Sequence, residues 1–110
     1  MLSKRNRLSK KEILELLPKS KSLRGSFLLL RFKNLPEKNN FKAGVSISKK
    51  IAKSAVMRNK IRRIIYRELS YIKKNIMPAN LFFVVNKIAE NKELKEDVVV
   101  LLTKSGALKA

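Results

Sequence analysis

The spacing of apolar residues near the N-terminus predicts a short helix. Ser9 and Glu12 form the S-x-x-E pattern of a capping box, and Pro18 limits the helix that follows. Leu8 and Ile13 have the spacing of a hydrophobic staple across this cap. The apolar face of the helix is predicted to comprise Ile13, Leu14, Leu16 and Leu17. The polar stretch 19–26 that comes next is a loop or a short strand near Lys21–Arg24.

Two segments alternate with the period of a β-strand. Phe27–Lys33 places one set of apolar side chains on one face: Leu28, Leu30 and Phe32. Its opposite face mixes apolar and cationic side chains: Phe27, Leu29, Arg31 and Lys33. Phe41–Ser48 also has an apolar face, made of Phe41, Ala43, Val45 and Ile47. Because only the turn-like stretch Asn34–Asn40 separates the two segments, we expect them to pair as a hairpin.

The second half of the chain predicts two helices around a buried strand. Ser54 can cap a long helix that runs to about Asn75, with a buried stripe made of Met57, Ile61, Ile64, Ile65, Leu69 and Ile72. Leu81–Val85 is apolar on both faces, as in an interior strand. A last helix from about Asn91 to Lys104 would bury Leu94, Val98, Leu101 and Leu102, with Gly106 as its C-cap. The predicted order is α-β-β-α-β-α in a single domain over residues 1–110, with a further short strand if 21–24 is extended.

The charge of the chain predicts a polyanionic partner. The 110 residues include 27 Lys and Arg against 8 Asp and Glu, a formal charge of +19. Self-repulsion of this size opposes folding unless an anionic partner neutralises it. Residues 1–67 carry 20 of the cations and 3 of the acids, so the anion-binding surface should come from this part. The last third should mainly complete the fold.

The composition excludes most kinds of catalytic site. The chain has no His and no Cys, and its one Asp is Asp97, so we expect no catalytic residue and no protein metal site. The acids of the last helix alternate with lysines at helical spacing, which predicts a solvated face rather than a metal site: Glu90, Glu93, Glu96 and Asp97. The longest apolar runs have five residues, against the roughly 20 of a membrane span. With no apolar signal core near the start, we expect a cytoplasmic protein without a membrane partner.

The densest basic segment spans a loop and the start of the long helix. Seven of the fifteen residues in Lys49–Arg63 are cations: Lys49, Lys50, Lys53, Arg58, Lys60, Arg62 and Arg63. A helical wheel places Arg58 and Arg62 on one flank of the apolar stripe, and Lys60, Arg63 and Arg67 on the other, with Asn59 between them. The planar guanidinium of arginine can bind two phosphate oxygens at once, so this helix is the first candidate for a nucleic-acid surface.

Two further segments could contact nucleic acid. The strand face that carries Phe27 and Arg31 could stack a base and neutralise a phosphate, although Phe27 also fits an ordinary core position. The N-terminal cations Lys4, Arg5 and Arg7, with Asn6, belong to a basic arm over residues 1–8 that could be flexible. For Tyr66 and Tyr71 we predict packing at the edge of the stripe.

These residues resemble the bacterial ribonuclease P protein component. The resemblance is carried by Ser46–Arg63, in which an Arg-Asn-x-x-Arg-Arg helix follows a Ser-x-Ser-Lys-Lys strand end. Lys4–Leu8, the strand with Phe27, the length, the charge and the element order also match. The resemblance implies an α/β (α+β) fold, a two-layer sandwich with about four strands and three helices, and a left-handed β-α-β crossover that general rules would not predict.

The family resemblance also implies a function. The chain would be the protein subunit of an RNA-based endoribonuclease that matures the 5′ end of tRNA, with catalysis and Mg²⁺ supplied by the RNA. Its partners would be the catalytic RNA, bound one to one by a monomer, and precursor tRNA; it would need no small-molecule substrate. The RNA-binding residues would be Lys49, Lys50, Lys53, Arg58, Asn59, Lys60, Arg62, Arg63 and Arg67. The cleft for the single-stranded 5′ leader would include Phe27, Leu30, Arg31, Ile13, Leu17, Ser46 and Ser48. Ile13, Leu17 and Leu30 stand where the family often has aromatic residues, and aliphatic groups stack weakly on bases.

Two other functions share the composition. A structural ribosomal protein would differ only in lacking the motif, and would copurify with ribosomal subunits rather than with one RNA. A DNA-binding regulator with Arg58–Arg67 as recognition helix fits less well, because nothing resembles a helix-turn-helix pair. A stand-alone nuclease is the weakest alternative, for want of His, Asp and metal ligands.

Overall fold

Helices and strands alternate along the chain in the order α-β-β-β-α-β-α. The computed structural model describes residues 2–109, and its main elements are α1 (Lys10–Leu16), β1 (Lys21–Arg24), β2 (Leu28–Asn34), β3 (Lys42–Ile47), α2 (Ala55–Tyr71), β4 (Ala79–Val85) and α3 (Asn91–Ser105). Single 3₁₀ turns occupy Lys4–Asn6, Leu17–Lys19 and Lys73–Asn75. The polar stretch after α1 therefore does contain the short strand. No helix within residues 2–109 combines the length and apolar character that crossing a bilayer requires.

The strands form one mixed sheet in the order β1-β2-β4-β3. β2 pairs antiparallel with both β1 and β4, whereas β3 pairs parallel with β4. The predicted hairpin between β2 and β3 is therefore wrong, because β4 lies between them. The physical reason is burial: β4 is apolar on both faces, and the centre of a sheet is where such a strand is best covered.

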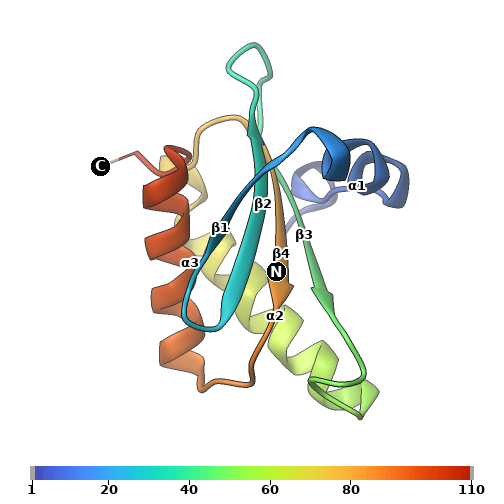
Figure 1. Ribbon diagram of the computed structural model, residues 1–110. Helices are drawn as coiled ribbons and strands as arrows, with labels where there is room; N and C mark the ends of the chain where they lie inside the picture. Colours follow the sequence, from blue (N-terminus) through green and yellow to red (C-terminus); the bar gives the residue numbers. More distant parts are fainter. Residues whose placement is uncertain (1, 110) are drawn as a thin grey trace.

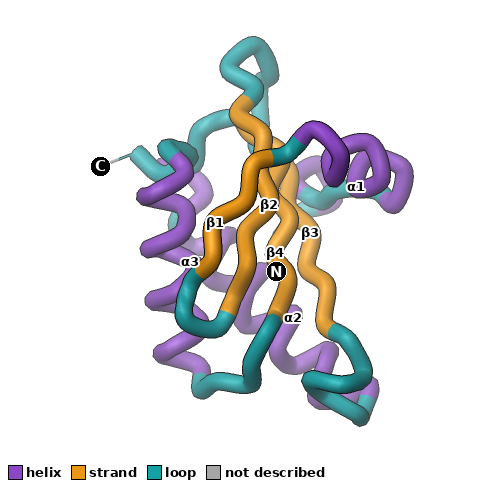
Figure 2. Tube along the Cα trace, in the orientation of Figure 1, coloured by secondary structure: helices purple, strands orange, loops and turns teal. Residues whose placement is uncertain are grey.

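The helices cover the two faces of the sheet unequally. α2 and α3 lie side by side behind the sheet, while α1 lies against its other face near β3 (Figures 1 and 2). β3 and β4 run in the same direction and α2 connects them behind the sheet (Figure 1). In that view β4 lies to the left of the downward-running β3, which makes the crossover left-handed, against the strong general preference for right-handed connections.

The core lies between the sheet and the α2–α3 layer. β2 contributes Leu28, Leu30 and Phe32 to this core, and α2 contributes Ile61, Ile65 and Leu69. Tyr66 of α2 is also buried, at 8% exposure. Three apolar positions predicted to pack are instead in contact with solvent: Leu14, Met57 and Tyr71, at 63%, 40% and 87% exposure. Met57 belongs to the first turn of α2, and this end of the helix extends past the end of the sheet (Figure 1).

The helix ends follow the predicted caps. Ser9 Oγ accepts from Glu12 N at 3.1 Å and Glu12 Oε1 accepts from Ser9 N at 2.9 Å, which completes the capping box. Ser54 Oγ accepts from Met57 N at 3.0 Å at the start of α2. Gly106 ends α3 with φ of 83°, a left-handed conformation that glycine adopts without strain.

Asp97 is a structural residue, not part of a solvated face. The residue is 7% exposed, and its carboxylate accepts three backbone hydrogen bonds, from Ser26 N (3.0 Å), Phe27 N (3.0 Å) and Leu28 N (2.8 Å). It thereby fastens the turn between β1 and β2 to α3. A side chain on Gly25 would stand 2.5 Å from Asp97 Oδ2, so the turn also requires glycine there. The other acids of α3, Glu93 and Glu96, are exposed as expected.

Candidate nucleic-acid interface

The loop before α2 and the first turn of this helix form one unit. Lys49, Lys50 and Lys53 are exposed in the loop between β3 and α2. Arg58 Nη1 donates to the carbonyl oxygens of Ala52 and Lys53, both at 2.9 Å. Arg58 therefore holds the loop against the helix, so that the loop lysines stay beside the arginines of α2.

Asn59 has a positioning role within the predicted motif. Its side-chain Oδ1 accepts from Arg62 Nη1 at 2.8 Å. The bond leaves the remaining donors of the Arg62 guanidinium free, and it fixes the direction in which they point. An arginine that is already oriented loses less side-chain entropy on binding a phosphate. The asparagine in the Arg-Asn-x-x-Arg-Arg pattern therefore has a physical explanation that does not require a contact of its own with nucleic acid.

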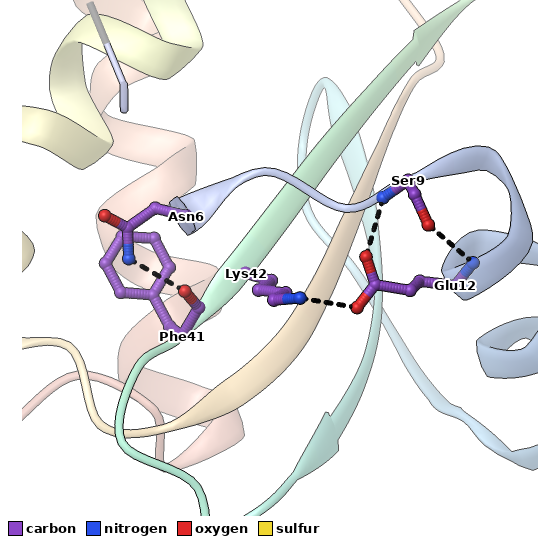
Figure 3. Close-up of polar contacts among 5 residues, drawn as sticks. All are labelled: Asn6, Ser9, Glu12, Phe41 and Lys42. Atoms are coloured by element: carbon purple, nitrogen blue, oxygen red, sulfur yellow. Dashed lines mark hydrogen bonds and ion pairs between the residues drawn. The ribbon is translucent and has the colours of Figure 1, made fainter. Parts of the chain in front are cut away.

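The N-terminal segment packs along β3 instead of extending from the domain. Asn6 Nδ2 donates to the Phe41 carbonyl at 2.9 Å, and Leu8 N donates to the Ala43 carbonyl at 2.9 Å. Beyond the capping box, Glu12 Oε2 accepts from Lys42 Nζ at 2.7 Å, which ties α1 to the same strand (Figure 3). Leu2 is 1% exposed. The described part of the basic arm is thus held in place, and Asn6, at 5% exposure, is an anchor whose amide is engaged with the protein.

This packing brings a cation from the N-terminal segment to α2. The Arg7 guanidinium carbon lies 5.7 Å from the centroid of the Tyr66 ring, within the range of a cation–π contact. Burial raises the pKa of the Tyr66 hydroxyl, and the nearby guanidinium groups of Arg62 and Arg7 act in the opposite direction. Tyr66 therefore connects two arginines that are distant in the sequence. Sequence reasoning assigned Tyr66 to packing, which is confirmed, but gave no signal for the Arg7 contact.

The cations of α2 are left without carboxylate partners. Lys60, Arg63 and Arg67 are exposed on the flank away from Arg62, as the helical wheel predicted. Within residues 2–109 the one ion pair is that between Lys42 and Glu12. We call the following set the cationic helix surface: Lys49, Lys50, Lys53, Arg58, Asn59, Lys60, Arg62, Arg63 and Arg67.

The sheet face opposite α2 and α3 is the second candidate surface. Ile13 covers one end of it, and Gly44 lets α1 approach closely: a Cβ on Gly44 would stand 3.3 Å from Ile13 Cδ1. Arg31 is tied to this end by bonds from Nη2 to the Leu17 carbonyl (2.9 Å) and from Nε to Ser20 Oγ (3.1 Å). The rest of the face, which we call the open sheet face, is lined by Leu29, Ser46 and Val84, with Ser48 exposed just beyond the end of β3.

One predicted cleft residue lies on the wrong side of the sheet. Leu30 is 0% exposed and faces Phe83 on the core side, because alternation along β2 puts it opposite to Leu29 and Arg31. Leu29 and Val84, which the cleft prediction omitted, occupy the open sheet face instead. Phe27 directly precedes β2, so no strand pairing assigns it to this face; it is half-buried and packs against the core. Phe82 also points this way, under α1, at 9% exposure.

The fold and the cationic helix surface together indicate to which class of protein the chain belongs. This is a small α+β protein in which cations from a helix, the loop before it and an N-terminal segment gather with no carboxylate among them, an arrangement typical of proteins that bind polyanions. Beside it lies a sheet face that mixes apolar groups with hydroxyls.

The comparisons with known proteins identify the family. The family model for ribonuclease P matches residues 2–106. The ribonuclease P protein component of Geobacillus sp. (strain WCH70) is 33% identical over 113 residues, covering 98% of this chain and 97% of that protein. A mutant of the Staphylococcus aureus RNase P protein has the same fold, with a TM-score of 0.86 at 23% identity over 96% of this chain and 92% of that one. The Thermotoga maritima protein aligns with a TM-score of 0.79 at 19% identity, over 89% of this chain and 96% of that one. The chain therefore belongs to the ribonuclease P protein family, whose members are the protein component of a tRNA-processing ribonuclease.

Proposed function

We propose that the cationic helix surface binds the catalytic RNA of ribonuclease P, and that the open sheet face holds the single-stranded 5′ leader of precursor tRNA. The observation that carries the first part is the pre-oriented pair Arg58 and Arg62, each fixed by hydrogen bonds, with Arg7 beside them. Fixed guanidinium groups without carboxylate partners suit phosphate oxygens at defined positions. Leader binding is supported by the proximity of half-buried apolar groups and serines on the part of this sheet face that α1 leaves uncovered.

Catalysis and Mg²⁺ binding are assigned to the RNA. The chain has no His or Cys, and the carboxylate of its one Asp is occupied by three backbone amides. Among residues 2–109 no three His, Cys, Asp or Glu side chains lie together as a metal-binding group. Mg²⁺ prefers oxygen ligands and is commonly held through phosphates, which the RNA has in abundance. The protein then acts as a monomer, one to one with the RNA, in the cytoplasm, and promotes 5′ maturation by binding both RNAs.

A reconstitution assay tests the proposal. The chain is added to ribonuclease P RNA at low Mg²⁺ concentration, and cleavage of precursor tRNA is measured with and without it. We expect cleavage to require the RNA, to be stimulated by the chain, and to lose stimulation in Arg58→Ala/Arg62→Ala. The matched control is Lys92→Ala/Lys95→Ala, which removes the same charge from exposed positions on α3. Specific cleavage by RNA-free protein, or equal stimulation by both variants, would refute the assignment.

A further inference from the structure

A second cationic site lies at the far end of α2, where only the residues of the basic arm, among them Arg5 and Asn6, were predicted candidates. A hollow of about 370 Å³ opens between the 3₁₀ turn Lys73–Asn75, the N-terminal segment and the loop before β3. Its polar lining comes from three cations and three amides: Arg5, Lys73, Lys74, Asn6, Asn39 and Asn40. We propose that this hollow binds phosphates of an RNA backbone and extends the RNA-binding surface along the whole of α2. The inference rests on the proposed function of the cationic helix surface.

The fold, not the sequence, assembles the three cations. Arg5 is held in the 3₁₀ turn Lys4–Asn6, and its neighbour Asn6 is bonded to the Phe41 carbonyl at the start of β3. Lys73 and Lys74 lie in the 3₁₀ turn that follows Ile72, the C-cap residue of α2. None of the residues lining the hollow is acidic, and no carboxylate within residues 2–109 forms an ion pair with any of the three cations. The local potential is therefore positive and uncompensated.

The N-terminal segment links the hollow to the cationic helix surface, because Arg5 lines the hollow and Arg7 contacts Tyr66 of α2. Arg62 and Arg7 both lie near the Tyr66 hydroxyl, and Arg5 is two residues before Arg7 on the same segment. The cations thus continue from the loop before α2, past Tyr66, to the turn after the helix. α2 has 17 residues and so spans about 25 Å. A surface of this length fits successive phosphates of a polymer better than a single small anion, because its lysines are exposed point charges and not an enclosing pocket.

Salt dependence separates a phosphate site from a structural one. Lysines at the C-terminal end of a helix also complement its dipole, so Lys73 and Lys74 could serve only to stabilise α2. A lysine that neutralises a phosphate releases a counterion, and losing one lowers the slope of log K against log salt by about 1. A lysine that only stabilises the helix leaves this slope unchanged.

The test compares Lys73→Gln/Lys74→Gln with the control Lys92→Gln/Lys95→Gln, which removes the same charge from the start of α3. Affinity is measured for the ribonuclease P RNA, and then for precursor tRNA binding to the assembled holoenzyme, each at several salt concentrations. We expect the first variant to bind one of these RNAs roughly 10- to 100-fold more weakly, with a salt slope lower by about 1–2. The RNA whose affinity falls is the one that occupies the hollow. We expect the control to match the parent.

Three results would overturn the inference. One is that Lys73→Gln/Lys74→Gln binds both RNAs with the same affinity and the same salt slope as the parent. Another is a lower melting temperature with an unchanged salt slope, which would limit the lysines to helix stabilisation. The third is an equal loss in the control, which would show that only net charge matters. If the parent itself binds neither RNA, the proposed function fails, and that outcome is distinct from all three.

Discussion

Replacing Asp97 should reveal how far the fold depends on one carboxylate. Asp97→Ala leaves the amides of Ser26, Phe27 and Leu28 without their acceptor in a site that is 7% exposed. Hydrogen bonds to a charged group contribute about 1.5–3 kcal/mol each, but such terms do not add fully when one group makes all three. We therefore expect a loss of about 3–5 kcal/mol in the free energy of unfolding, the usual cost of removing one partner of a buried charged interaction.

Thermal melting measures this loss directly. A chain of this size should lose roughly 4 °C in melting temperature per kcal/mol, so Asp97→Ala should melt about 12–20 °C lower. Asp97→Asn keeps one acceptor oxygen and should fall between this variant and the parent. Glu96→Ala is the control, because it removes a neighbouring exposed acid and should change stability by less than about 0.5 kcal/mol.

The same variant separates structure from catalysis. Below its lowered melting temperature, Asp97→Ala should still support cleavage by the ribonuclease P RNA, with any defect confined to binding of the leader beside Phe27. If Asp97→Ala melts within a few degrees of Glu96→Ala, the three amide bonds do not stabilise the turn as described. If it melts normally but abolishes cleavage, Asp97 acts directly in cleavage and is not only a structural residue.

Two other predictions concern the site, and a third concerns the packing of α1 against β3. Asn59→Ala should weaken binding of the catalytic RNA less than Arg62→Ala does, and little further once Arg62 is absent, because Asn59 acts by orienting that guanidinium; a double-mutant cycle of RNA affinities measures this. Phe27→Ala should weaken binding of precursor tRNA by about 1–3 kcal/mol more than binding of mature tRNA, as measured by holoenzyme affinities for the two substrates. The hydrogen bond from Lys42 lowers the pKa of Glu12, so the charged form stabilises the fold above the ordinary pKa of 4.5, and this stability is lost as pH falls through the lowered value. The melting temperatures of Glu12→Gln and the parent should therefore differ at neutral pH and converge in acid.

Each of these has a clear contrary result. Additive effects of Asn59→Ala and Arg62→Ala would mean that Asn59 contacts RNA by itself. Equal losses for precursor and mature tRNA, with a lower melting temperature, would make Phe27 a core residue only. A difference between Glu12→Gln and the parent that persists in acid would show that the carboxylate charge is not what stabilises α1 against β3.

The features that the sequence predicted correctly depend on neighbouring residues. The capping box at Ser9, the N-cap at Ser54 and the αL glycine at Gly106 involve contacts within about four positions, so local spacing is enough to predict them. The alternation of β2 and the stripe of α2 are likewise set by the period of the backbone. The gathering of cations on one helix followed from the same periodicity, and its resemblance to the ribonuclease P family was specific enough to identify the family.

The tertiary structure alone decided which segments meet. β4 separates β2 from β3 because the most apolar strand takes the centre of the sheet, and that choice involves residues far apart in the chain. Asp97 changes from a presumed surface acid to an anchor because its partners are backbone amides about 70 positions away. Arg7 reaches Tyr66, and Arg5 lines the same hollow as Lys73 and Lys74, because Asn6 fastens the N-terminal segment to β3. Hydrogen bonds to distant backbone leave no periodic trace in a sequence, so the composition predicted a polyanion partner while the folded chain determined where the cations lie.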